Sequence, residues 1–169
     1  MSRPQIREYR RRIAGGDKNL VGFLVGSVQY AVDIRRVREI LRPLPVLAMP
    51  HVPPAVVGVA DHRGEVVPVL ELRRRFGLEP SIEDRRTKWI LVDVAGRGVG
   101  LVVDAVTGVL ATSDVDQRPA PVLGSGDAAR GITAVYSHGA GLLFVLDIDR
   151  VAAPAQVVDL GAAPLRRTT

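Results

Sequence analysis

Short runs of apolar residues, most of them valine and leucine, recur along the chain between turns that contain glycine or aspartate. Runs of this length bounded by turn residues are typical of β-strands. They predict strand–turn–strand hairpins over residues 20–34, 56–70, 88–106 and 131–147. Many short strands at close spacing indicate an all-β barrel or sandwich.

Two short segments are predicted to be helical instead. The apolar residues of segment 34–41 follow the 3.6-residue period of an amphipathic helix, and the carboxylate of Asp33 can cap its start. A second short helix is expected to begin at Ile148. Residues 1–19 are basic with only a weak helical face, and residues 153–169 are rich in alanine and proline. Both ends are therefore predicted to be flexible, and 20–152 to be the folded domain.

Segment 50–78, PHVPPAVVGVADHRGEVVPVLELRRRFGL, carries the most local information. Its adjacent prolines hold the entry extended, and its two apolar strands are joined by the turn Asp61-His62-Arg63-Gly64. Pro68 in the returning strand predicts a sheet edge or a bulge. The segment presents one ionised tip, Arg63, and no group suited to catalysis.

Composition narrows the class of protein. The 169 residues contain no cysteine, which excludes disulfides and thiolate chemistry. The net charge of +5 comes mainly from arginines in scattered clusters without interleaved aromatic residues, so a solvated basic surface, or one that faces an acidic protein, is favoured over a nucleic-acid platform. No apolar run reaches the roughly 18 residues of a membrane span, and no signal-peptide pattern is present, so a soluble cytoplasmic protein is expected.

No catalytic set is visible. His51, His62 and His138 all fall in predicted turns without metal-ligand spacing, and we interpret them as solvated. Asp104 is interpreted as a structural carboxylate that satisfies backbone N–H groups at a bend. The sequence thus predicts no enzyme activity, no cofactor and no metal.

The order of motifs resembles the CheW-like chemotaxis adaptor family. Segment 50–78 matches that family's pattern at Pro50, Pro53, Gly58, Arg63, Gly64, Pro68, Leu72 and Phe76. Residues 100–106, GLVVDAV, and 142–148, LLFVLDI, match later motifs, and the likeness covers about residues 20–152. The chain departs at Asp61 and His62, where the family prefers Asn-Leu, and at Glu71, where it prefers Asp.

The resemblance implies an all-β fold of two small, intertwined, five-stranded SH3-like β-barrels with short helices and a groove between them. Residues near 35–85 are expected in one barrel, which a strand from the chain ends completes. Residues near 88–135 are expected to supply most of the other.

The resemblance also implies a function: a non-catalytic adaptor of a two-component chemotaxis system. Such adaptors couple the cytoplasmic tip of a chemoreceptor, a methyl-accepting chemotaxis protein, to the regulatory domain of a CheA-type histidine kinase, at receptor clusters and in some cases with other CheW-like proteins. Six matching positions are candidate partner-binding residues: Val37, Glu39, Gly58, Arg63, Gly100 and Val109.

Alternatives remain open for the residues and for the function. Arg63 can instead tie its own hairpin together, Glu39 can be a solvated helix carboxylate, and Val37 and Val109 can belong to the core. A scaffold that binds receptors or other adaptors without kinase coupling is a second function, and a basic nucleic-acid or membrane-surface module is a more remote one. If His62 lies in a kinase interface, the departure from leucine predicts weaker binding.

Overall fold

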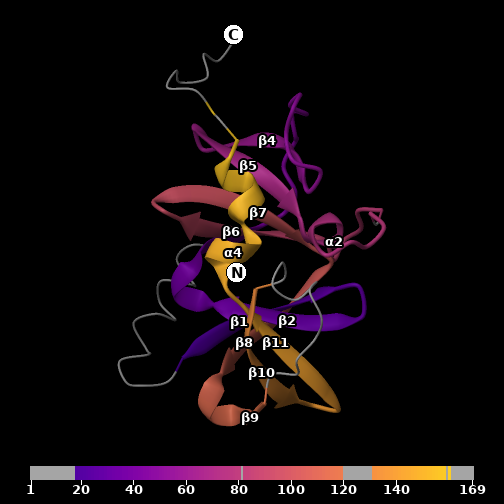
Figure 1. Cartoon of the computed structure of the whole chain (residues 1–169), viewed down its shortest axis with the longest axis vertical. Helices are drawn as coiled ribbons and strands as arrows, with labels where there is room; N and C mark the ends of the chain where they lie inside the picture. Colours follow the sequence, from indigo (N-terminus) through magenta and orange to yellow (C-terminus); the bar gives the residue numbers. More distant parts are fainter. Residues whose placement is uncertain (1–17, 81, 120–130, 159, 161–169) are drawn as a thin grey trace.

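The computed structural model describes residues 18–80, 82–119, 131–158 and 160, which form two antiparallel-rich sheets (Figure 1). The first sheet has six strands in the order β8-β1-β2-β11-β10-β9. Its strands are β1 (Asn19–Val25), β2 (Val28–Asp33), β8 (Ala105–Ala111), β9 (Asp116–Arg118), β10 (Ile132–His138) and β11 (Gly141–Leu146). The prediction of an all-β fold is confirmed.

The second sheet has five strands in the order β3-β6-β7-β5-β4. Its strands are β3 (Val37–Leu41), β4 (Val56–His62), β5 (Glu65–Glu71), β6 (Lys88–Val94) and β7 (Arg97–Val103). Five strands per unit were expected, and this sheet has that number while the other has six. All four predicted hairpins are present, as β1–β2, β4–β5, β6–β7 and β10–β11.

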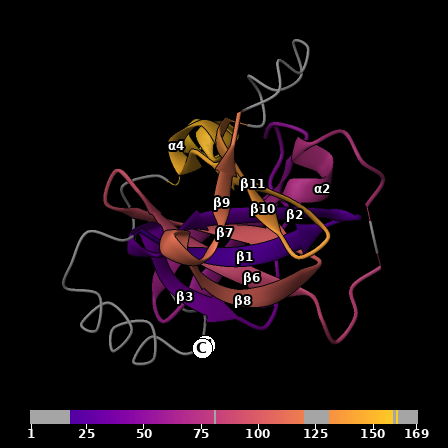
Figure 2. The ribbon, with the colours of Figure 1, turned by 90° about the horizontal axis from the view of Figure 1, so that it is seen from below.

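Helices within residues 18–80, 82–119 and 131–158 are few and short. They are the 3₁₀ turns η1 (Ile34–Arg36) and η2 (Thr112–Asp114), and the helices α2 (Leu72–Arg75), α4 (Ile148–Val151) and α5 (Ala153–Gln156). The helix predicted from Ile148 is confirmed, and the Asp147 carboxylate accepts a hydrogen bond from the Asp149 N–H at its start. Viewed from below, α4 lies on the side of the molecule opposite to the edge strands β3 and β8 (Figure 2).

The helix predicted over 34–41 is wrong beyond its first turn. Asp33 does cap η1, because its carboxylate accepts from the N–H of Arg35, but the chain then extends as β3. β3 pairs with β6, some 50 residues later in the sequence, where Ile40 lies opposite Ile90. Ladder hydrogen bonds to a distant strand therefore override a local pattern that also fits a helix.

The expected division of the chain between two units is also wrong. β6 and β7, which were assigned to the unit of residues 88–135, belong to the same sheet as β3, β4 and β5. The chain crosses to the other sheet at Asp104, between β7 and β8. The N–H of Asp104 donates to the Leu24 carbonyl, and its carboxylate accepts from the Gly26 N–H and from Arg73.

Asp104 therefore has the structural role predicted for it: it holds the sheet-to-sheet crossing against the β1–β2 turn. Pro68 does not mark an edge, because β5 lies between β7 and β4. The parallel pairing of β5 with β7 starts at Val69, directly after the proline. Pro68 has no N–H to give to that ladder, so its position just outside the pairing is tolerated.

The two sheets share one hydrophobic core. A single cluster of buried residues joins Phe23 and Val32 of the first sheet to Leu70, Ile90 and Leu101 of the second. The rings of Tyr30 and Phe76 pack across the boundary at 5.0 Å between centroids. Because the core is continuous, we expect the sheets to unfold together.

Packing continues beyond the predicted domain end at residue 152. Ala155 of α5 and Val158 are buried in the shared core, and Leu160 packs partly against it. Most of the predicted flexible segments, residues 1–17 and 161–169, lie outside the described residues. Asn19, placed in the N-terminal segment by prediction, begins β1.

The segment after residue 152 is thus expected to stabilise the fold, and two neighbouring valines test this. Val158 is 5% exposed, whereas Val157 is 71% exposed. Val158→Ala should lower the free energy of unfolding by about 2 kcal/mol, from lost burial and the cavity left behind. Val157→Ala should change it by less than about 0.5 kcal/mol. Equal effects in urea denaturation would show that this segment does not pack as described.

Candidate functional site: a pocket between the two sheets

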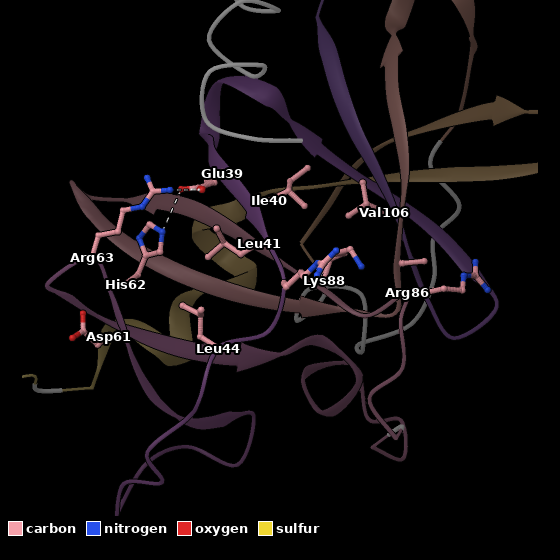
Figure 3. Close-up of a pocket in the computed structure, with 12 residues that line it drawn as sticks. Glu39, Ile40, Leu41, Leu44, Asp61, His62, Arg63, Arg86, Lys88 and Val106 are labelled. Carbon is pink, nitrogen blue, oxygen red and sulfur yellow. Dashed lines mark hydrogen bonds and ion pairs between the residues drawn. The ribbon is translucent and has the colours of Figure 1, made fainter.

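A pocket of about 860 Å³ lies where the five-stranded sheet meets β8 of the other sheet (Figure 3). Its apolar lining comes from both sheets, with Ile40 and Leu41 on β3 and Val106 on β8. Its polar lining is mostly basic. The full set is Glu39, Ile40, Leu41, Arg42, Leu44, Asp61, His62, Arg63, Arg86, Lys88, Ala105 and Val106. A groove between two units was predicted, and this pocket has that position.

A buried carboxylate stands at one end of the pocket. The side chain of Glu39 on β3 is only 7% exposed, and one of its oxygens, Oε1, accepts a hydrogen bond from Arg63 at 3.0 Å. The other oxygen, Oε2, lies 3.3 Å from Nε2 of His62 but forms no hydrogen bond within the described part of the chain. Glu39 is therefore neither helical nor solvated, contrary to the alternative considered for it.

Arg63 and His62 come from the far edge of the same sheet. β3 and β4 are its two edge strands, so their contacts with Glu39 require the sheet to curl until the edges meet. Figure 3 shows both side chains converging on Glu39. We call Glu39, His62 and Arg63 the edge clasp. Arg63 thus ties its hairpin to the opposite edge, while its side chain stays 61% exposed beside the pocket.

The turn that carries Arg63 is built for this position. Arg63 has φ of +53° and Gly64 has φ of +85°, so both central residues occupy the left-handed region. The Asp61 carboxylate accepts a hydrogen bond from the Gly64 N–H at 2.8 Å. Asp61 thus closes the turn as an asparagine would, which makes this departure from the family pattern structurally neutral.

His62 is not in the turn, and it is not solvated. It is the last residue of β4, and its side chain is only 10% exposed. Its burial against Glu39 places it within its own sheet rather than on an outer surface. Sequence reasoning singled out this residue because it replaces a leucine, but nothing local in the sequence indicated its contact with Glu39.

Two other candidate residues are buried. Val37 is completely inaccessible in the shared core, so any effect on a partner would have to be indirect. Gly58 on β4 is also buried and has φ of +150°. A Cβ atom there would lie 2.2 Å from the carbonyl oxygen of Leu47, because the chain before β4 bridges back to Val59. A close approach of two backbone segments thus accounts for glycine at this position.

The last two candidates lie on different sheets. Gly100 is buried on β7, where an added Cβ would contact the Trp89 ring at 3.4 Å. Val109 lies on the edge strand β8 and is partly exposed, with its inner side against the shared core. Of the six candidates only Glu39 and Arg63 line the pocket. Sequence reasoning missed Arg42, Arg86 and Lys88, because nothing local links position 42 to positions 86–88.

Two arginines outside the pocket form ion pairs between elements that are distant in the sequence. Arg38 on β3 donates to Asp93 at 2.6 Å and lies 3.2 Å from Glu65, so it joins three strands. Hydrogen bonding from the Arg38 guanidinium lowers the pKa of Asp93. Arg36 similarly binds Asp149 at 2.6 Å, which attaches α4 to η1 and lowers the pKa of Asp149.

These contacts predict a pH-dependent part of the stability. A carboxyl whose pKa is lowered by folding stabilises the fold above its unfolded pKa, and this contribution is lost as the pH falls through the lowered value. Arg38→Gln should therefore lower the free energy of unfolding at neutral pH by up to about 1 kcal/mol, a small value because Asp93 is partly exposed. The difference in the free energy of unfolding between this variant and the original protein should shrink from about pH 5 toward about pH 3. Denaturant titrations against Arg97→Gln, at an exposed residue that has no ion pair with any described residue, would check this; a constant difference would contradict it.

Two further kinds of feature are absent from the part of the chain that the structure describes. Its His, Cys, Asp and Glu side chains form no group of three or more that could hold a metal ion. None of its helices is long and apolar enough to cross a membrane.

Comparison with known proteins identifies the family. Residues 19–156 match the CheW-like domain model. The chain is 38% identical to a probable chemotaxis protein CheW of Rhizobium etli over 71% of this chain and 79% of that protein. It is 34% identical to chemotaxis protein CheW of Rhizobium meliloti over 83% of this chain and 91% of that protein.

A solved structure supports the fold. The scaffolding protein TtCheW of Thermoanaerobacter tengcongensis superposes with a TM-score of 0.69 at 22% identity, over 80% of this chain and 88% of that chain. Since the family model spans most of the chain and both relatives exceed 30% identity, the chain belongs to the CheW-like domain family of non-catalytic chemotaxis adaptors, which couple receptors to the kinase CheA.

Proposed function

We propose that this chain couples the cytoplasmic tip of a chemoreceptor to the regulatory domain of a CheA-type histidine kinase. The observation that carries the proposal is the pocket between the two sheets, with an apolar floor and the edge clasp at one end. A helical hairpin can anchor apolar side chains in such a groove. A rigid β-sheet framework orders few groups on binding, so little conformational entropy opposes association.

Within this function, the candidate residues divide by accessibility. Arg63 is the proposed direct receptor contact, because its planar guanidinium can bind the partner while it also binds Glu39. Val109 is a second direct contact, on the exposed side of β8. Glu39 acts through Arg63, and Val37, Gly58 and Gly100 act by holding the two sheets in shape.

Separate binding measurements test the proposal. The immobilised protein should capture a chemoreceptor cytoplasmic fragment and, independently, the regulatory domain of the kinase encoded with it. Capture of the receptor alone would indicate a scaffold without kinase coupling. Capture of neither would show that the proposed function is wrong.

A further inference from the structure

Three basic residues of the pocket differ from several arginines elsewhere on the protein in having no carboxylate partner among the described residues. Arg35, Arg36 and Arg38 each bind a carboxylate of their own chain. In contrast, Arg42, Arg86 and Lys88 form no ion pair with any carboxylate in the described ranges, although all three line the pocket. We call these three residues the basic rim.

Arg86 lies across the pocket from the edge clasp, and Lys88 lies between them. Figure 3 shows Arg63 and His62 at one end, Lys88 nearer the middle, and Arg86 with Val106 at the other end. The ammonium of Lys88 donates to the carbonyls of Arg85 and Thr87, which fixes it in place without neutralising its charge. Arg42 and Arg86 are exposed, so their guanidinium groups are accessible.

The local charge balance is positive. The lining contains four basic side chains and two carboxylates, and the more buried carboxylate, Glu39, is already bound by Arg63. A cleft lined by one sign of charge concentrates the field and favours a partner of the opposite sign. The apolar floor of Ile40, Leu41 and Val106 adds a second requirement, because a purely anionic ligand would leave it uncovered.

From these observations we infer that the receptor segment held in this pocket carries acidic residues beside its apolar anchors, and that the basic rim pairs with them. This inference rests on the proposed function and adds to it the chemistry that selects the receptor. The apolar anchors would supply contact area, and the rim would determine orientation and choice among receptors.

A pair of matched double variants tests the inference. Arg42→Glu with Arg86→Glu reverses the exposed part of the rim. Arg85→Glu with Arg97→Glu makes the same change in net charge at exposed residues outside the pocket. Affinity for a chemoreceptor cytoplasmic fragment is measured by calorimetric titration at low and high salt, and affinity for the kinase regulatory domain serves as a check on folding.

The rim variant should bind the receptor fragment at least about tenfold more weakly, with a smaller salt dependence, while the control stays within about twofold of the original protein. Kinase affinity should be unchanged in both. Single Glu→Lys or Asp→Lys changes are then made near the tip of the receptor fragment. A change at an acidic residue that pairs with the rim should restore binding to the rim variant.

Equal weakening by the two double variants would show only long-range attraction and overturn the inference, as would an unchanged affinity of the rim variant. In either case receptor binding by the original protein would leave the proposed function standing. No receptor binding by the original protein would overturn both. The original protein could also bind a DNA duplex or anionic vesicles. If the rim variant lost that binding but kept its receptor affinity, the rim would belong to another class of partner, and the inference would be contradicted.

Discussion

Gly58→Ala is expected to lower the free energy of unfolding by about 3 kcal/mol or more, because strain and overpacking act together. The new Cβ would lie 2.2 Å from the Leu47 carbonyl oxygen and 2.8 Å from Cγ1 of Val46. The φ of +150° is also unfavourable for any residue with a side chain. The clash involves backbone, so no rotation of a neighbouring side chain relieves it.

Gly64→Ala is the matched control for this substitution. Gly64 has φ of +85° in the turn of the same hairpin, but an added Cβ would meet nothing within 4 Å. Its cost should be limited to backbone strain, about 1 kcal/mol. Denaturant unfolding measures both. A fully stable Gly58→Ala variant that has lost receptor binding would contradict the packing role and make Gly58 a direct contact.

Arg63→Glu is expected to weaken binding of the receptor fragment by about 2 kcal/mol or more, which is about thirtyfold. The substitution removes the guanidinium at the pocket mouth and places a second carboxylate beside Glu39. Because the Arg63 side chain is mostly exposed, the secondary structure and the circular dichroism spectrum should be retained, but the free energy of unfolding should fall because the buried Glu39 carboxylate loses its partner. Arg97→Glu, on an exposed residue outside the pocket, should leave affinity nearly unaltered.

A neutral double variant separates two roles of Arg63. Glu39→Gln with Arg63→Gln removes both charges, so no carboxylate is left buried without its partner. If the Arg63 guanidinium contacts the receptor, this variant should bind as weakly as Arg63→Glu. Recovery of the original affinity would mean that Arg63 serves only to neutralise Glu39, and it would remove Arg63 from the proposed contacts.

The hairpins could be predicted from sequence because each depends on neighbouring residues. The turns at Gly26, Gly64, Gly96 and Gly139 each have φ between +59° and +85°, and apolar runs flank them. Local sequence contains both signals. For the same reason, capping by Asp33 could be predicted from the residue type and its position.

The errors arose where distant residues decide the structure. Segment 34–41 fits a helical period, but β3 forms because β6 offers it a partner. The sequence VVDAV around Asp104 resembles one continuous strand, yet the chain changes sheets there because Leu24, Gly26 and Arg73 hold Asp104. Neither partner set lies near its segment in the sequence.

The site shows the same division. Arg63 could be chosen as a candidate binding residue from sequence because its turn and the motif around it are formed by neighbouring residues. The burial of Glu39 could not, since it requires the curled sheet to bring β4 against β3. The grouping of Arg42 with Arg86 and Lys88 depends on the pairing of β3 with β6. The residues that shape the pocket are thus known only once both sheets are assembled.

The coupling itself can be measured by reconstitution. Autophosphorylation of the kinase is followed with receptor fragments assembled on a membrane, in the presence and in the absence of this protein. The proposed function predicts that the receptor changes the phosphorylation rate only when the protein is present, and that Arg63→Glu abolishes the change while Arg97→Glu retains it. Receptor control of the kinase that is the same with and without the protein would contradict its role as the coupling adaptor.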